Sequence, residues 1–102
     1  MRAIAKIVDL IEDELSGAEE YAELAIRWKA EHPKTAELLH ELASVEMTHA
    51  KRLHTEAERL IEEERTRHGE PPAAMLAVYE YEHRKQIKRA AETRALIEEF
   101  ST

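Results

Sequence analysis

Proline falls at only two places in this sequence of 102 residues, and those two places divide it into three long segments. Pro33 interrupts the chain once, and the Gly-Glu-Pro-Pro run at 69–72 interrupts it again. Proline disfavours helical geometry in the residue before it and suits the first turn of a following helix. Ala, Glu, Leu, Lys and Arg dominate between the breaks, as is typical of helices. The sequence therefore predicts a single all-α domain with three helices, over about residues 2–31, 34–67 and 73–100.

Each segment carries apolar residues at the three- and four-residue spacing of an amphipathic helix. The first stripe consists of Ile4, Ile7, Val8, Ile11, Leu15, Ala18, Ala22, Ala25 and Ile26. The second consists of Leu38, Leu39, Leu42, Leu53, Leu60 and Ile61, and the third of Leu76, Tyr79, Ile87, Ala90, Ala91 and Ile97. Because the break at Pro33 is short, we expect the first two helices to be antiparallel neighbours. Three helices cannot complete a four-helix bundle, so we expect oligomerisation to complete the core.

The composition argues against several classes of protein. The formal net charge of −7 disfavours a nucleic-acid partner. Cysteine is absent, which excludes disulfides, thiol nucleophiles and sulfur-ligated metal centres. No apolar run approaches the roughly 20 residues that span a bilayer, and Lys6, Asp9 and Glu12 interrupt any signal-peptide core. We expect a cytoplasmic protein with no nucleic-acid or membrane partner.

Five ionisable residues interrupt the three apolar stripes. Glu14 interrupts the first, Glu46 and His49 the second, and Glu80 and His83 the third. Side chains at positions i and i+3 project from the same face of a helix, so each Glu-x-x-His pair can hold one ion. Burying an unpaired carboxylate is costly, and such a residue normally has a charged partner or a metal ion. These five residues are therefore the candidate metal ligands.

Each candidate also has a purely structural interpretation. The chain is rich in Glu and contains 6 His, so a Glu-x-x-His pair arises easily by chance. Glu14 can form an ion pair with a cation of a neighbouring subunit, and His49 can be a hydrogen-bonded core histidine. Basic side chains next to Glu80 and His83 offer ion-pair partners for that pair. The other histidines are expected in loops or on the surface: His32, His40, His54 and His68.

Carboxylates and imidazoles in three separate stripes match the ligands of a carboxylate-bridged di-metal site. Two cations about 3.5–4 Å apart need bridging carboxylates, terminal carboxylates and one imidazole each. Oxygen and nitrogen ligands without sulfur suit iron, manganese or zinc. Helical bundles build di-iron sites from a Glu on each of two helices and Glu-x-x-His on each of the other two. The pattern predicts a carboxylate-bridged di-metal site that holds iron, manganese or zinc.

Two stretches resemble the rubrerythrin-like branch of the ferritin-like superfamily. They are the Glu-Leu-Ser-Gly-Ala-Glu-Glu-Tyr run that begins at Glu14 and the Glu-Met-Thr-His-Ala-Lys-Arg-Leu run that begins at Glu46. The resemblance covers about half of the chain. It implies that Glu14 is a terminal ligand, that Glu46 bridges the metals, that His49 supplies an imidazole and that Tyr21 hydrogen-bonds near the site. The Tyr-Glu-Tyr-Glu-His run at 79–83 is similar to an element of short bacterial ferritin-like proteins.

The resemblance implies a protein that oxidises Fe(II) with oxygen or peroxide, or that reduces peroxide. A complete ferritin-like chain has four helices, whereas this one predicts three and lacks a rubredoxin-like tail. In one solution, a homodimer contributes Glu14, Glu46 and His49 twice to a shared site. In the other, Glu80 and His83 complete a site within or between protomers of a homodimer or larger homo-oligomer. Two further functions stay open: a non-catalytic helical interaction module, and a helical protein that holds zinc or manganese structurally.

Overall fold

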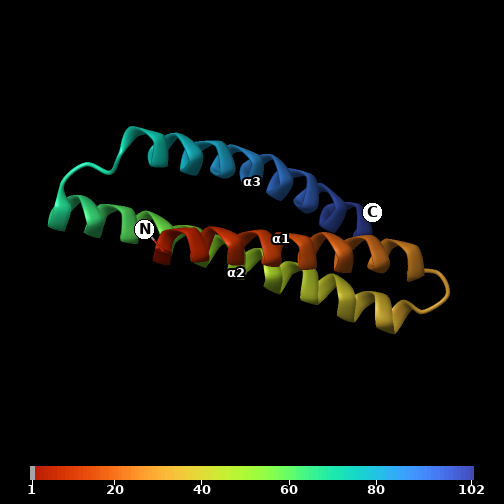
Figure 1. Ribbon diagram of the computed structural model, residues 1–102. Helices are drawn as coiled ribbons and strands as arrows, with labels where there is room; N and C mark the ends of the chain where they lie inside the picture. Colours follow the sequence, from red (N-terminus) through yellow and green to blue (C-terminus); the bar gives the residue numbers. More distant parts are fainter. Residues whose placement is uncertain (1) are drawn as a thin grey trace.

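The chain folds into three long helices without strands in the part that the structure describes, residues 2–102 of a computed structural model (Figure 1). Helix α1 spans Arg2–Trp28, α2 spans Pro33–His68 and α3 spans Ala73–Phe100. The all-α prediction is confirmed, and the helix bounds agree except that α1 ends earlier than residue 31. The backbone N–H of Gly69, which has a φ of 80°, donates to the carbonyl of Arg65 and ends α2.

Helices α1 and α2 form an antiparallel hairpin, as the short break predicted (Figure 1). Their contact is built largely from alanine. Buried residues recur at seven-residue spacing on both helices: Ile4, Ile11, Ala18 and Ala25 on α1, and Ala36, Ala43, Ala50 and Ala57 on α2. A seven-residue repeat keeps one seam facing the partner helix, and small side chains let the two backbones approach closely.

The leucine stripe predicted for α2 is not its most buried face. Leu38 is 53% exposed, and Leu42 and Leu53 are only half-buried. The buried alanines of α2, from Ala36 to Ala57, face α1 instead, and we call them the alanine seam. The leucines lie beside this seam. A helix of 36 residues with two apolar faces can cover only one of them against a single neighbour. This second face stays partly open to solvent.

Helix α3 lies along α1 and contacts α2 less extensively (Figure 1). Gln86 is buried and donates from Nε2 to the carbonyl of Val8 at 3.2 Å. Thr93 is also buried, with its hydroxyl bonded to the carbonyl of Arg89. Ile87 and Ala91, which the pattern placed on the inner side of α3, are both exposed, Ile87 by 52%, so the prediction was wrong for these two residues. The side of α3 that packs on α1 is centred on polar residues.

The molecule is a thin rod of 55 × 18 × 18 Å. Its hydrophobic core cluster joins Ile11, Leu15 and Ala50, with Met47 and Ala90 packed against it. Of the helices described, none is both long and apolar enough to cross a membrane. So slender a molecule buries few large side chains, and several apolar residues stay exposed: Trp28, Leu38, Val45, Val78, Tyr81 and Ile87.

Candidate metal centre

Three of the five predicted ligands come together where α1 and α2 pack against each other. Glu14 extends from α1, and Glu46 and His49 extend from consecutive turns of α2. One ligand atom from each residue can be chosen so that all three lie within 4.8 Å of one another. The Nδ1 atom of His49 lies 3.5 Å from Oε2 of Glu14 and 4.0 Å from Oε1 of Glu46. Two carboxylates and one imidazole form a suitable donor set for iron, manganese or zinc.

Gly17 makes room for this arrangement. It lies on α1 close to the Glu46 carboxylate, and a Cβ atom at this position would lie 3.1 Å from Oε2 of Glu46. Most contacts between a Cβ atom and a neighbouring side chain are longer than this. A helix interior normally disfavours glycine because of its backbone entropy, so its presence here has a steric benefit. The gap at Gly17 lets the Glu46 carboxylate lie against the α1 backbone.

The electrostatics of the cluster favour a bound cation or proton. The pKa of the Glu46 carboxyl is raised, first because it shares a hydrogen bond with the Glu14 carboxyl, and then because of burial and the negative charge of Glu14. Two carboxylates can share such a bond only when one of them carries a proton. In the charged form Oε2 of Glu14 is a buried atom without a hydrogen-bond donor among the described residues. His49 lowers the Glu46 pKa, but more weakly.

An orphaned carboxylate oxygen beside a second carboxylate and an imidazole fits the requirements of a metal ion. The ion would offset the negative charge of the two carboxylates, to which the described part of the chain offers only the His49 imidazole as a nearby ion-pair partner. The cluster is also partly open, since the side chains of Glu14 and Glu46 are each 26% exposed and that of His49 is 46% exposed. An ion or a second protein surface can therefore reach it.

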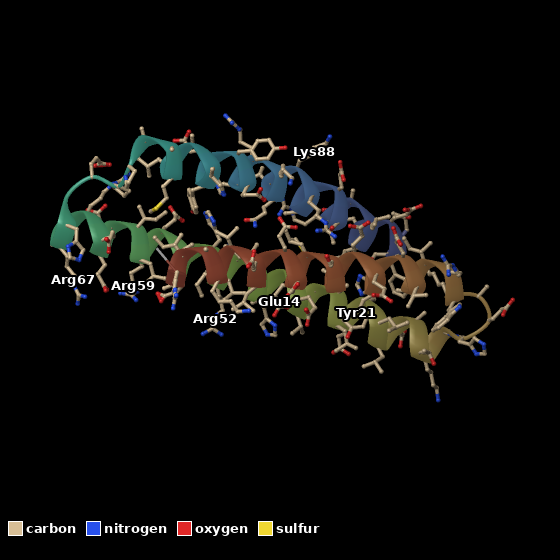
Figure 2. All side chains as sticks on the ribbon, viewed as in Figure 1. Glu14, Tyr21, Arg52, Arg59, Arg67 and Lys88 are labelled. Carbon is tan, nitrogen blue, oxygen red and sulfur yellow. The ribbon has the colours of Figure 1, made fainter. Side chains whose placement is uncertain are left out.

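Both helices present further apolar residues on the side of the cluster. On α1, Tyr21 and Trp28 follow Glu14 at seven-residue steps, and Figure 2 shows Glu14 and Tyr21 on the side of the hairpin away from α3. On α2, Leu38 and Val45 share a stripe with His49, and Leu38 is 53% and Val45 45% exposed. The candidate ligands therefore lie within a partly exposed apolar surface.

Glu80 and His83 are not part of this cluster. Glu80 is exposed on α3. The His83 ring stacks on His54 of α2, with centroids 4.4 Å apart, and on Tyr79 at 6.0 Å. Burial and the nearby His54 lower the pKa of His83. The structure thus joins Glu14, Glu46 and His49 and leaves the second Glu-x-x-His pair elsewhere, so its ligand role stays a prediction.

The sequence interpretation missed the ion pairs that hold α3 on α1. Arg89 donates to Glu12 at 2.9 Å, to Glu19 at 3.3 Å and to the hydroxyl of Ser16 at 2.8 Å. Glu12, Ser16 and Glu19 lie at i, i+4 and i+7 on one face of α1, and this polar stripe is the signal that could have predicted a basic partner. Tyr21 is half-buried and makes no hydrogen bond within residues 2–102.

Comparison of this chain with known protein families, curated proteins and solved structures finds no match. The resemblance to the ferritin-like superfamily therefore stays a prediction, and the case for a function rests on the geometry of the cluster.

Proposed function

We propose that this chain is a carboxylate-bound iron protein of the non-haem di-iron class, acting on Fe(II) with oxygen or peroxide or reducing peroxide. The observation that carries the proposal is the convergence of Glu14, Glu46 and His49 within 4.8 Å. Three residues that the sequence spacing singled out as ligands lie together, although Glu14 is more than thirty positions away from the other two. The raised pKa of Glu46 and the orphaned Glu14 oxygen support it, because both reflect an excess of negative charge.

Each residue has a distinct part in this proposal. Glu46 would bridge two metal ions, as the resemblance implies, and its carboxylate contacts Glu14 and lies close to the α1 backbone at Gly17. Glu14 and His49 would be terminal ligands, with the second imidazole nitrogen of His49 left for an outer partner. Bound iron supplies redox chemistry and open coordination positions for the oxidant. Glu14, Glu46 and His49 would hold the ion, and its positive charge would favour the deprotonated form of Glu46.

Three ligands are too few for two metals, and we infer that a second copy supplies the rest. A two-fold dimer that joins the hairpins over the exposed stripe with Leu38 and Val45 would present Glu14, Glu46 and His49 twice. Such an interface is self-complementary, because the same patch meets itself. It also covers apolar side chains that the described chain leaves open. The two hairpins together then make four helices, which is the number that di-iron bundles use.

The test is an anaerobic Fe(II) titration with metal analysis of the wild type, Glu46→Ala and His49→Ala. We expect about one iron per chain in the wild type and almost none in either variant, because each loses a ligand. Glu62→Ala is the matched control, since Glu62 is an exposed carboxylate of the same helix more than three turns beyond His49. Exposure to oxygen, then to peroxide, is followed by absorbance.

Full iron occupancy in Glu46→Ala would refute the assignment. Binding without oxidation by either oxidant would favour a structural metal site, of the kind that zinc or manganese could fill. No binding at any iron concentration would favour the non-catalytic interaction module, which needs the apolar stripe but not the three ligands.

A further inference from the structure

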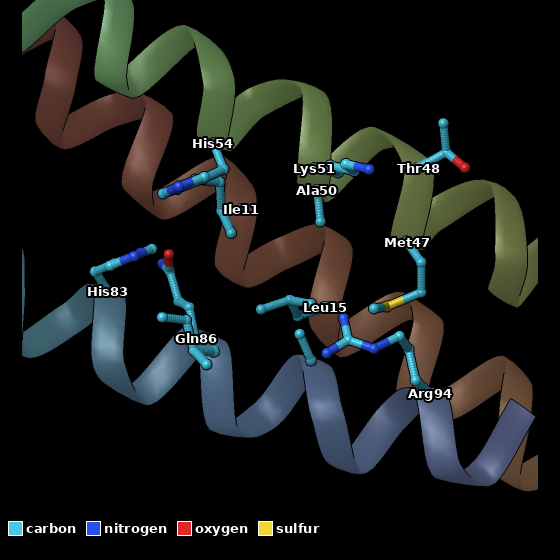
Figure 3. Close-up of a pocket in the computed structure, with 12 residues that line it drawn as sticks. Ile11, Leu15, Met47, Thr48, Ala50, Lys51, His54, His83, Gln86 and Arg94 are labelled. Carbon is cyan, nitrogen blue, oxygen red and sulfur yellow. The ribbon is translucent and has the colours of Figure 1, made fainter.

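A groove of about 600 Å³ opens on the other side of the hairpin, between α2 and α3 (Figure 3). Ile11 and Leu15 of α1 and Ala50 of α2 line its inner part, and Met47 and Ile87 line its walls. It shares no lining residue with the Glu14, Glu46 and His49 cluster. The volume lies in the range of small-molecule sites, about 300–1,000 Å³.

The polar residues that line the groove include two cationic side chains and two histidines. Lys51 and His54 come from α2, and His83 and Arg94 from α3. Although the sequence holds 22 Asp and Glu, none is among the described residues that line the groove. Glu58 approaches only the histidine end, where it pairs with His54 at 3.0 Å. A basic groove in an acidic protein is suited to an anionic group.

Lys51 and Arg94 have no counter-ion within the described chain. Figure 3 shows the Arg94 side chain extending from α3 into the space between the helices. Arg89 of the same helix, in contrast, is paired with Glu12 and Glu19. A guanidinium and an ammonium beside an apolar surface can bind a carboxylate head group while the surface takes an alkyl chain.

Contacts between α2 and α3 close the groove at both ends. At one end the rings of His54 and His83 stack at 4.4 Å. Toward the other, His40 stacks on Phe100 at 4.4 Å and bonds through Nε2 to the carbonyl of Ile97 at 3.1 Å. A helix is about 10–12 Å across and would have to break these contacts to lie along the groove. The opening suits a narrower occupant.

The length of the groove sets the length of the occupant. The α2 lining begins at Met47 and ends at His54, which is about 10 Å of helix. An extended alkyl chain of about eight carbons spans that distance. We propose that this groove binds a medium-chain carboxylate, with its head group on Arg94 and Lys51 and its chain along Ile11, Leu15 and Ala50. The site is separate from the proposed iron centre and does not depend on it.

The test titrates octanoate into the metal-free protein, using calorimetry and the ¹³C-methyl NMR signals of methionine. We expect saturable one-to-one binding that shifts Met47, which lines the groove, and leaves Met75, which does not, unchanged. Octanol and octylamine have the same chain without the negative charge and should bind at least about tenfold more weakly, because charged hydrogen bonds are lost. Equal affinities for the three ligands, or no saturable shift of Met47, would overturn the proposal.

Variants locate the head group. Arg94→Met keeps the apolar length of the side chain and should weaken octanoate binding about tenfold or more, and Lys51→Met should act in the same direction. Lys88→Met is the control, because Lys88 also lies on α3 but points away from the groove (Figure 2). If Arg94→Met and Lys51→Met both bind octanoate like the wild type, the proposal is wrong.

A filling variant separates a ligand from a second copy of the chain. Ala90→Trp places a large ring in the groove and should abolish the Met47 shift without changing the oligomeric state. Circular dichroism checks that the helices remain. If Ala90→Trp dissociates an oligomer instead, a second copy occupies the groove, and the carboxylate proposal is overturned.

Discussion

Replacing Gly17 with alanine should separate the stability of the fold from the affinity of the metal centre. The new Cβ would lie 3.1 Å from Oε2 of Glu46, so the Glu46 carboxylate has to move by a few tenths of an ångström. Its end is flexible and can give way. The backbone, in contrast, gains, since alanine in a helix interior is more favourable than glycine by about 0.5–1 kcal/mol.

The two effects have opposite signs. The metal-free Gly17→Ala protein should unfold at the same or a higher temperature than the wild type, with a gain of at most about 4–8 °C for a domain of this size. Its metal affinity should fall about tenfold, which corresponds to about 1.4 kcal/mol, because the displaced carboxylate no longer meets the ion in the same position as Glu14 and His49.

The assay combines thermal unfolding by circular dichroism in chelator with competitive Zn(II) and anaerobic Fe(II) titrations. Thr55→Ala is the control for helix propensity, because Thr55 is exposed on α2 and its hydroxyl bonds only to the carbonyl of Lys51. It should raise stability slightly and leave metal affinity alone. Unchanged metal affinity in Gly17→Ala would refute the inference that the gap at Gly17 positions Glu46 for binding.

Three other predictions concern charge and assembly. Because the pKa of Glu46 is raised above its ordinary 4.5, the folded state holds that proton more tightly than the unfolded state does. The unfolding free energy of the metal-free protein should therefore contain a stabilising contribution that is present at low pH and is lost as pH rises through the raised pKa. Glu46→Gln should lack this contribution. Identical pH profiles of the unfolding free energy for the two proteins in urea titrations would contradict the prediction. Arg89→Met should cost about 1–2 kcal/mol in denaturant unfolding, because three hydrogen bonds between α1 and α3 are lost. Arg84→Met, an exposed change on the same helix, should cost little, and equal effects of the two would argue against the Arg89 network. Val45→Glu should lower the mass observed by sedimentation to that of one chain, because it places a charge in the proposed dimer interface; an unchanged mass would exclude that stripe as the interface.

Much of the secondary structure follows from the sequence because its signals are local. Pro33 starts α2, and Gly69 with the two prolines after it ends that helix and precedes α3. Local signals also placed Glu46 and His49 one turn apart on one face. For Glu14, the sequence indicated only that the side chain faces inward from α1. The structure adds that its Oε2 atom lies 3.5 Å from Nδ1 of His49.

The contacts between helices were less predictable, because they depend on which faces meet. The stripe of α3 suggested Ile87 as an inner residue, yet Gln86 and Thr93 are buried and Ile87 is exposed. A buried Gln is acceptable here because it bonds to the carbonyl of Val8, a partner that no sequence pattern reveals. The exposed Ile87 instead forms part of the wall of the groove.

The sequence by itself determined three helices, their breaks and the Glu-x-x-His spacing, since each depends on residues within a few turns of one another. Tertiary structure alone decided which of the two apolar faces of α2 is covered. The alanine seam from Ala36 to Ala57 packs on α1 because small side chains allow close approach, and this leaves the stripe of Leu38, Val45 and His49 open. It also decided that His83 meets His54 and not Glu46, because α3 packs on the side of the hairpin away from the cluster.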